Sequence, residues 1–219
     1  MQKILPIEGN KQKTKPLSVV HRSGQYDSGY LDSELWEAFR NDSMLAYKAI
    51  YMEYADLLFN YGRKIIAEDE LIKDSIQDFF VELWNRRKNL DNVKSIRAYL
   101  FVGFRRKLLE KKKKMLRFQR IDDTENFEII LSNHITLQNI GIKEDKIAPL
   151  VKALNDLPER QKEAVFLRFY NKLSCNEIGE ILDINSQSVY NLIHRALKIL
   201  RHVLSSFGVL LLSFANNIY

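Results

Sequence analysis

Apolar residues recur at steps of three and four along most of this chain, and that spacing is typical of α-helices with one buried face. The first series follows the N-cap candidates at 41–43 and comprises Tyr47, Ile50, Tyr51, Tyr54, Leu57, Leu58, Tyr61 and Ile65. A second series runs from about Glu68 to Trp84, and a third runs from Ser95, its expected cap, to Leu109. No strand period of useful length occurs, so we predict an all-α fold.

A second helical module follows a break in this pattern. Residues 119–145 are interrupted by Asp, Asn and Gly, which indicates a linker. Beyond it, Ser174 and Glu177 form a capping-box pattern before a short helix, a turn at 183–186 and a long helix. That is the helix-turn-helix layout. We therefore predict a flexible N-terminal arm (1–30), two small helical domains (31–118 and 146–205) joined by a linker (119–145), and an apolar C-terminal tail (206–219).

Composition narrows the class of protein. With 46% hydrophobic residues and a formal net charge of +6, the chain can bury a core and favours acidic partners. Its single cysteine, Cys175, excludes an intrachain disulfide and a cysteine-based zinc cluster. The longest apolar stretch, 207–214, is too short to span a bilayer, and the N-terminus does not read as a signal peptide. We expect a cytoplasmic protein that is not inserted in a membrane.

Charge is divided unevenly between the predicted helices. The second helix carries six acids and one base between Glu68 and Glu82, whereas the third becomes strongly basic from Arg105 onward. The last helix has polar residues at its start and bases later, with no acid between Asn185 and His202. Such a helix suits contacts to base edges and phosphates in a DNA groove. Gly179, in the short helix before it, would allow the two helices to cross closely. The acidic face suits a basic protein surface, although an ordinary solvated helix is the competing interpretation.

Residues that carry enzymatic chemistry are not grouped. The four histidines are far apart, the glycines form no phosphate-binding loop, and Cys175 has no neighbouring base. We expect no catalytic residue, no metal, no cofactor and no small-molecule substrate, so the protein is not predicted to be an enzyme. Three aromatic residues of the third helix offer base stacking as an alternative to a core role, and the core role is favoured: Tyr99, Phe101 and Phe104.

These features, in this order, resemble a bacterial RNA polymerase sigma factor of the extracytoplasmic-function (ECF) type, which consists of regions 2 and 4. The segment from Asp74 to Trp84 matches the D-x-x-Q-[DE]-x-F-x-x-x-W signature, and Ser95–Phe101 matches the S-[IVF]-x-x-[YW]-L-[FY] segment. In the second module, the stretch from Leu154 to Gln161 matches L-x-x-L-P, and Val189–Leu197 continues the resemblance. Region 2 would occupy domain 31–118 and region 4 domain 146–205.

The resemblance implies partners for each surface: core RNA polymerase, promoter DNA and an anti-sigma factor. Polymerase-binding residues would be Asp74, Gln77, Asp78, Phe80, Glu82 and Trp84. Contacts to the −10 element, including capture of a flipped base, would come from Asn89, Asn92, Arg97, Arg105, Arg106 and Lys107. Contacts to the −35 element would come from Ser186, Gln187, Ser188, Asn191, His194, Arg195 and Lys198.

Two departures from the family pattern concern DNA contacts. Many relatives have A-R-N where this chain has Phe104-Arg105-Arg106, and S-R-L where it has Asn191-Leu192-Ile193. The segment 189–197 is closer to sigma factors of the Bacteroidota. The implied function is transcription initiation with promoter recognition and DNA melting, and attraction between the acidic helix and the basic modules would close the free protein. Two alternatives remain, namely a helix-turn-helix regulator that acts without polymerase and an interaction module such as an adaptor.

Overall fold

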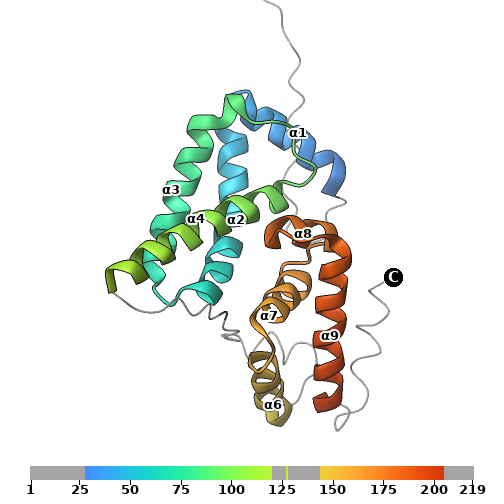
Figure 1. Cartoon of the computed structure of the whole chain (residues 1–219). Coiled ribbons are helices and arrows are strands. Elements are labelled where there is room, and N and C mark those ends of the chain that lie inside the picture. Colours follow the sequence, from blue (N-terminus) through green and yellow to red (C-terminus); the bar gives the residue numbers. More distant parts are fainter. Residues whose placement is uncertain (1–27, 120–126, 128–143, 205–219) are drawn as a thin grey trace, which may run out of the picture.

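The computed structural model describes residues 28–119, 127 and 144–204, and within them every regular element is helical. The N-terminal domain contains α1 (Ser28–Arg40), α2 (Met44–Ile65), α3 (Asp69–Arg86), the 3-10 turn η1 (Arg87–Asn89) and α4 (Ile96–Gln119). As Figure 1 shows, α2 and α3 run side by side and α4 crosses them. The all-α prediction is confirmed.

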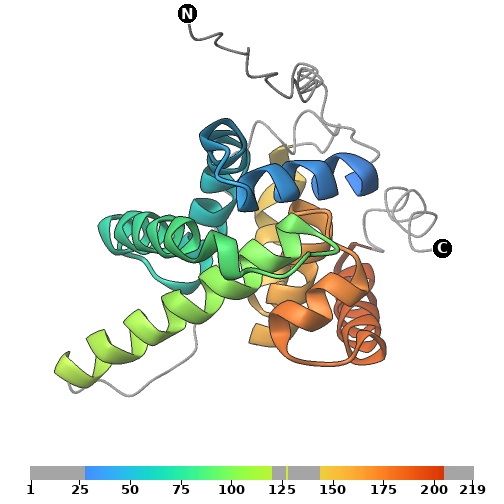
Figure 2. The same ribbon diagram turned by 90° about the horizontal axis from the view of Figure 1, so that it is seen from above.

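The C-terminal domain contains α6 (Glu144–Asn155), α7 (Glu159–Val165), the π-helical turn η2 (Phe166–Tyr170), α8 (Cys175–Leu182) and α9 (Ser186–Leu204). Helices α6, α7 and α8 pack against α9, and α8 also packs against α4 of the other domain. In both views α8 lies beneath the N-terminal half of α4 (Figures 1 and 2). Two helical domains, the second with a helix-turn-helix, are therefore present as predicted.

Two helices begin at serine side chains that the sequence already identifies as candidate N-caps. The Ser43 hydroxyl accepts a hydrogen bond from the Ala46 amide at the start of α2, and Ser95 does the same for Ala98 at the start of α4, both at 3.2 Å. Such caps satisfy amides that the helix itself leaves without partners. Gly103 lets α4 cross α3 closely, because a Cβ there would lie 2.6 Å from the Phe79 ring.

The apolar core is continuous across the two domains. Buried side chains of α1–α4 and of α7–α9 belong to one cluster, and a smaller cluster joins α6, α7 and α9. At the domain boundary the Tyr61 and Phe166 rings stack with centroids 6.4 Å apart, and Phe127 packs against both. The sequence predicts two modules, and these aromatic contacts contribute to their packing into one body in this structure.

Element boundaries differ from the predictions at three places. Helix α1 begins at Ser28, so the last three residues of the expected arm are helical. Pro158 precedes α7 as its N-cap and does not occupy its first turn. Most of the expected linker and all of the tail 206–219 lie outside the described residues, as do residues 1–27 of the arm. Within the described ranges, no helix is both long and apolar enough to cross a membrane.

Candidate protein and nucleic-acid interfaces

The outer face of α3 displays the acids that the sequence singled out. Asp74, Gln77, Asp78 and Glu82 are all exposed, whereas Ile72, Ile76, Phe79 and Leu83 form the buried face of the same helix. Asp78 lies 2.8 Å from the Lys111 ammonium group, and Glu82 accepts a hydrogen bond from Lys107. The hydrogen bond from Lys111 holds the pKa of Asp78 below its ordinary value. Asp78 and Glu82 thus pair with α4 of their own domain, and Asp74 has no such partner among the described residues.

Two aromatic residues predicted to bind polymerase do not lie on this open face. Phe80 is 1% exposed and packs in the core against Tyr51 and Phe79, so in this structure it supports the α3 face from beneath, and its contact with polymerase stays a prediction. Trp84 is half-buried, with the Arg87 guanidinium group 3.9 Å from its ring centroid. The helical period does place position 80 on the buried face, because it continues the series of Ile72, Ile76, Phe79 and Leu83.

The connector between α3 and α4 is held against α1. Leu90 is buried, and the Trp36 indole N–H donates to the Asp91 carbonyl at 2.9 Å. Arg40 donates to the Asn92 side-chain oxygen at 2.5 Å, and both Asn89 and Asn92 are exposed. The connector is therefore an anchored loop that presents both predicted asparagines to solvent.

The cations predicted to contact the DNA backbone at the −10 element differ in exposure and in the groups they bind. Arg106 is open to solvent, with 84% of its side chain exposed, and lies 3.5 Å from Glu110. Lys107 is 16% exposed and bonded to Glu82. Arg97 and Arg105 both reach the other domain, where Arg97 donates to the Asn171 carbonyl at 3.1 Å. In this arrangement Arg97 and Arg105 hold a domain interface, and their contacts to the −10 element stay a prediction that requires the domains to separate.

A buried polar cluster joins the domains, formed by Tyr61, Arg105 and Glu163 and hereafter called the Glu163 cluster. Arg105 binds Glu163 with two hydrogen bonds, Nε to Oε1 at 2.9 Å and Nη2 to Oε2 at 3.2 Å. The Tyr61 hydroxyl donates to Glu163 Oε1 at 2.5 Å. Two-pronged contacts of this kind are among the strongest hydrogen bonds in proteins. The cluster pins α7 to both α2 and α4.

Burial and charge shift the pKa values of Tyr61 and Arg105 in the Glu163 cluster. Burial raises the pKa of Tyr61 well above its ordinary value, and the negative charge of Glu163 adds to this effect. Burial alone would lower the pKa of Arg105, but the hydrogen bonds and charge of Glu163 outweigh it and raise the pKa above its ordinary value. Arg105 therefore stays charged in the packed form.

A second set of polar contacts surrounds the start of α4. The Ser95 hydroxyl donates to Glu177 Oε1 of α8 at 2.5 Å. Burial raises the pKa of Asp32, and nearby Glu177 raises it further, against the lowering effects of a backbone hydrogen bond and Arg97. The side chain of Asn171 is 2% exposed, yet neither of its polar atoms finds a partner within the described residues. An unsatisfied buried amide costs stability and works against this packing.

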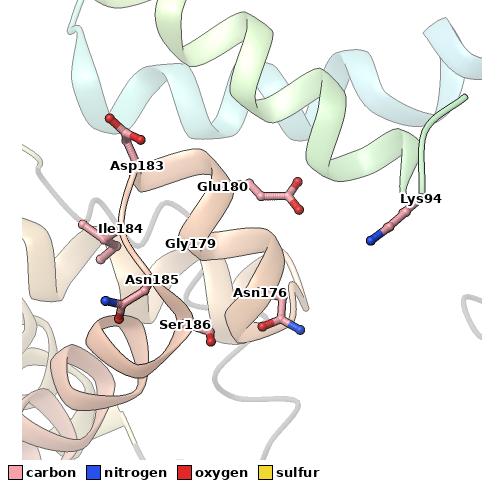
Figure 3. Close-up of a pocket in the computed structure, with 8 residues that line it drawn as sticks. All are labelled: Lys94, Asn176, Gly179, Glu180, Asp183, Ile184, Asn185 and Ser186. Carbon is pink, nitrogen blue, oxygen red and sulfur yellow. The ribbon is translucent and has the colours of Figure 1, made fainter. Parts of the chain in front are cut away.

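A polar pocket of about 650 Å³ separates the connector from the helix-turn-helix. Figure 3 shows Lys94 on one side and Asn176, Glu180 and Ser186 on the other. The predicted −10 loop and the turn of the helix-turn-helix thus face each other across a solvent-filled gap.

The helix-turn-helix itself is built by local contacts that the sequence predicts. The Ser174 hydroxyl accepts from the Glu177 amide at 3.2 Å, and Glu177 accepts from the Ser174 amide at 2.7 Å, which confirms the capping box. A Cβ at Gly179 would lie 2.6 Å from the Ile184 carbonyl oxygen, so the tight turn needs glycine there. Asp183 ends α8 in the left-handed region at φ 54°. The half-buried Cys175 matches the predicted small packed residue.

The outer face of α9 is open along its length. Asn185 caps the helix by accepting from the Ser188 amide at 2.7 Å. Of the predicted −35 residues, Ser188 is half-buried and the others are exposed: Ser186, Gln187, Asn191, His194, Arg195 and Lys198. The opposite face packs into the domain through Val189, Ile193, Ala196 and Leu200. A helix with one anchored face and one polar, acid-free face fits a DNA groove.

Family models match both domains. The model of sigma-70 region 2 matches residues 50–117, and that of sigma-70 region 4 matches residues 147–200, so that together they cover more than half of the chain. The chain belongs to the sigma-70 family. Its two matched regions and its relatives agree with a sigma factor of the ECF type that acts in transcription initiation.

Two curated relatives in Bacillus subtilis are RNA polymerase sigma factors. SigV is 29% identical over 151 residues, which cover 68% of this chain and 82% of SigV. YlaC is 24% identical over 147 residues, which cover 67% of this chain and 85% of YlaC.

Two solved structures share the fold. CnrH, solved with the cytosolic domain of CnrY, has a TM-score of 0.55 at 18% identity and covers 80% of this chain and 97% of its own. RpoE of Bartonella quintana, solved with the anti-sigma factor NepR, has a TM-score of 0.54 at 19% identity and covers 73% of this chain and 96% of its own.

Sequence reasoning missed the residues that join the domains of this sigma factor. No sequence pattern distinguishes Glu163 from other polar residues of its helix, and Tyr61 fits the apolar series of the first predicted helix like any other core aromatic residue. The expected attraction between the acidic helix and the basic modules takes a different form, because the acid at the domain boundary comes from region 4 and the base from region 2. Tyr190 is not among the predicted −35 residues, yet it is exposed, and its spacing from Gln187 and His194 places it on the α9 outer face.

Proposed function

We propose that this sigma factor binds core RNA polymerase through α3, reads the −10 element with the connector and α4, and reads the −35 element with α9. Residues 31–118 and 146–205 are the two working domains, joined by the segment 119–145. By holding an unstacked base of the −10 element, the connector favours melted DNA over duplex. The protein would act in the cytoplasm as an initiation factor without catalytic chemistry of its own, and assignment to the Bacteroidota type also remains a proposal.

The observation that carries this proposal is the separation of charge between two exposed helix faces. The α3 face presents Asp74, Gln77 and Asp78, whereas the exposed residues of α9 from Ser186 to Arg201 include cations and polar groups but no acid. An acidic face repels a duplex, so it must serve another kind of partner, and a basic surface of a protein machine fits it. A regulator that acts on DNA alone gives no role to such a face.

The packed arrangement supports a resting form that must open before the −10 element is read. Arg97, Arg105 and Ser95 are all engaged with region 4, and α8 lies against the start of α4. Separating the domains would release these groups and expose the connector on the side of the pocket. CnrH and RpoE were each solved with a protein partner, which supports the further proposal that an anti-sigma factor controls this chain.

The test of polymerase docking is a double charge reversal on α3. We expect Asp74→Arg with Asp78→Arg to abolish capture of the protein by core polymerase, because two cations would replace the acids of the docking face. The matched control reverses two exposed acids of α1, Glu34→Arg with Glu37→Arg, and should leave capture unchanged. Retained capture by the α3 variant, with its melting temperature intact, contradicts the proposal and favours the regulator that works without polymerase.

A further inference from the structure

The outer face of α9 carries one large aromatic surface among its polar groups. Tyr190 is 40% exposed, and among the described residues of α9 the other exposed large apolar side chain is Ile199, more than two turns further along. The Tyr190 hydroxyl has no hydrogen-bond partner among those residues. An exposed ring in the first turns of a helix whose other apolar residues there are buried or half-buried points to a surface that is covered by something else.

His194 holds this ring in place. The two rings lie one helical turn apart and are nearly parallel, with centroids 6.4 Å apart and an interplanar angle of 17°. A ring that already leans on a neighbour loses less conformational freedom when it meets a ligand. The pair therefore forms a preset apolar patch on the first three turns of α9, where a recognition helix meets base edges.

The polar neighbours of Tyr190 are suited to contacting adenine, the base that pairs with thymine. Gln187 and Asn191 flank it at positions −3 and +1, and their side-chain amides lie 3.4 Å apart, within hydrogen-bond distance. Asn and Gln amides match the N6 and N7 edge of adenine, and an apolar side chain matches the thymine methyl group. Both halves of an A·T pair thus find their complementary chemistry within two turns of one helix.

We propose that Tyr190, supported by His194, determines specificity by contacting the methyl group of a thymine in the −35 element. The proposal rests on the proposed function, because it requires that α9 enter the major groove of promoter DNA. The cations Arg195 and Lys198 would supply affinity for phosphates without regard to sequence, whereas the Tyr190 ring would discriminate between bases.

The experiment uses holoenzyme assembled from core polymerase and the full-length chain. A duplex library with a randomised −35 segment is selected for binding, and each thymine of the selected sequence is then replaced by deoxyuridine, which lacks only the methyl group. For the wild type we expect one position at which this replacement weakens binding about three- to fivefold, as loss of one buried methyl contact implies. With Tyr190→Ala, we expect deoxyuridine at that position to cause no loss of binding. With Tyr190→Phe, we expect deoxyuridine to weaken binding as much as it does for the wild type.

Ile199→Ala is the matched control, because it truncates an exposed apolar residue of the same helix beyond the reading turns, and it should keep the methyl dependence. If the wild type tolerates deoxyuridine at every position, or if Tyr190→Ala weakens binding to all sequences equally, Tyr190 does not read thymine. If the library yields no enriched sequence, the proposed function fails and this proposal fails with it. Enrichment without methyl dependence overturns the role of Tyr190 alone.

Discussion

Replacing Glu163 with glutamine should loosen the contact between the two domains. Glu163→Gln keeps the size of the side chain but removes the charge opposite Arg105, whose side chain is 24% exposed, against 8% for Glu163. Removing one partner of a buried ion pair typically costs 3–5 kcal/mol. Because Arg105 retains some solvent and glutamine can still accept a hydrogen bond, we expect about 2–3 kcal/mol. That cost corresponds to about a 30- to 150-fold rise in the ratio of open to packed molecules.

Single-molecule energy transfer measures this ratio directly. The two dyes are attached to cysteines introduced at Asn85 on α3 and Arg201 on α9, both exposed, in a Cys175→Ser background. The wild type should show rare excursions to a longer distance, and Glu163→Gln should show them about 30 to 150 times as often.

The control for this experiment is Asp69→Asn, which removes a charge from an ion pair within region 2, 3.1 Å from Arg63. It should leave the frequency of opening at the wild-type value. If Glu163→Gln opens no more often than Asp69→Asn, the Glu163 cluster does not hold the domains together, and the reasoning from its geometry is refuted.

Three further outcomes are expected. Because burial raises the pKa of Asp32, the folded protein binds a proton there more readily than the unfolded chain. Asp32→Asn should therefore melt at a higher temperature than the wild type at about pH 7, and this difference should shrink as the pH is lowered to about 4.5. A difference that stays constant or grows contradicts this. Gly179→Val should destabilise region 4 by about 1–3 kcal/mol in urea unfolding, since its Cβ would press on the Ile184 carbonyl, and an unchanged midpoint would show that the turn adapts. Lys198→Gln should lower the salt dependence of holoenzyme binding to DNA by about one unit of slope for all sequences, and a sequence-dependent effect would assign Lys198 to base reading instead.

Local signals predict the parts of this molecule that are built from neighbours in sequence. The Ser174–Glu177 capping box, the Ser43 cap and the Gly179 contact all join residues fewer than six positions apart, so their residue types and spacing suffice to predict them. The exposure of Asp74 follows in the same way from the helical period, because α3 buries its opposite face.

Contacts between the domains could not be predicted in this way. Arg105 reads as one base in a cationic run, and only the packing of α7 against α2 and α4 turns it into the partner of Glu163, 58 residues away. Charge composition predicted attraction within the chain but not which groups attract each other, since Asp78 and Glu82 of α3 pair with lysines of their own domain.

Run-off transcription tests the central claim most directly. Core polymerase freed of other sigma factors is given genomic fragments with and without this protein, and with the variant Asp74→Arg plus Asp78→Arg. We expect discrete transcripts only when the wild-type protein is present. Identical transcripts in all reactions, or tight sequence-specific binding of duplex DNA by the isolated chain with no effect on polymerase, would contradict the account.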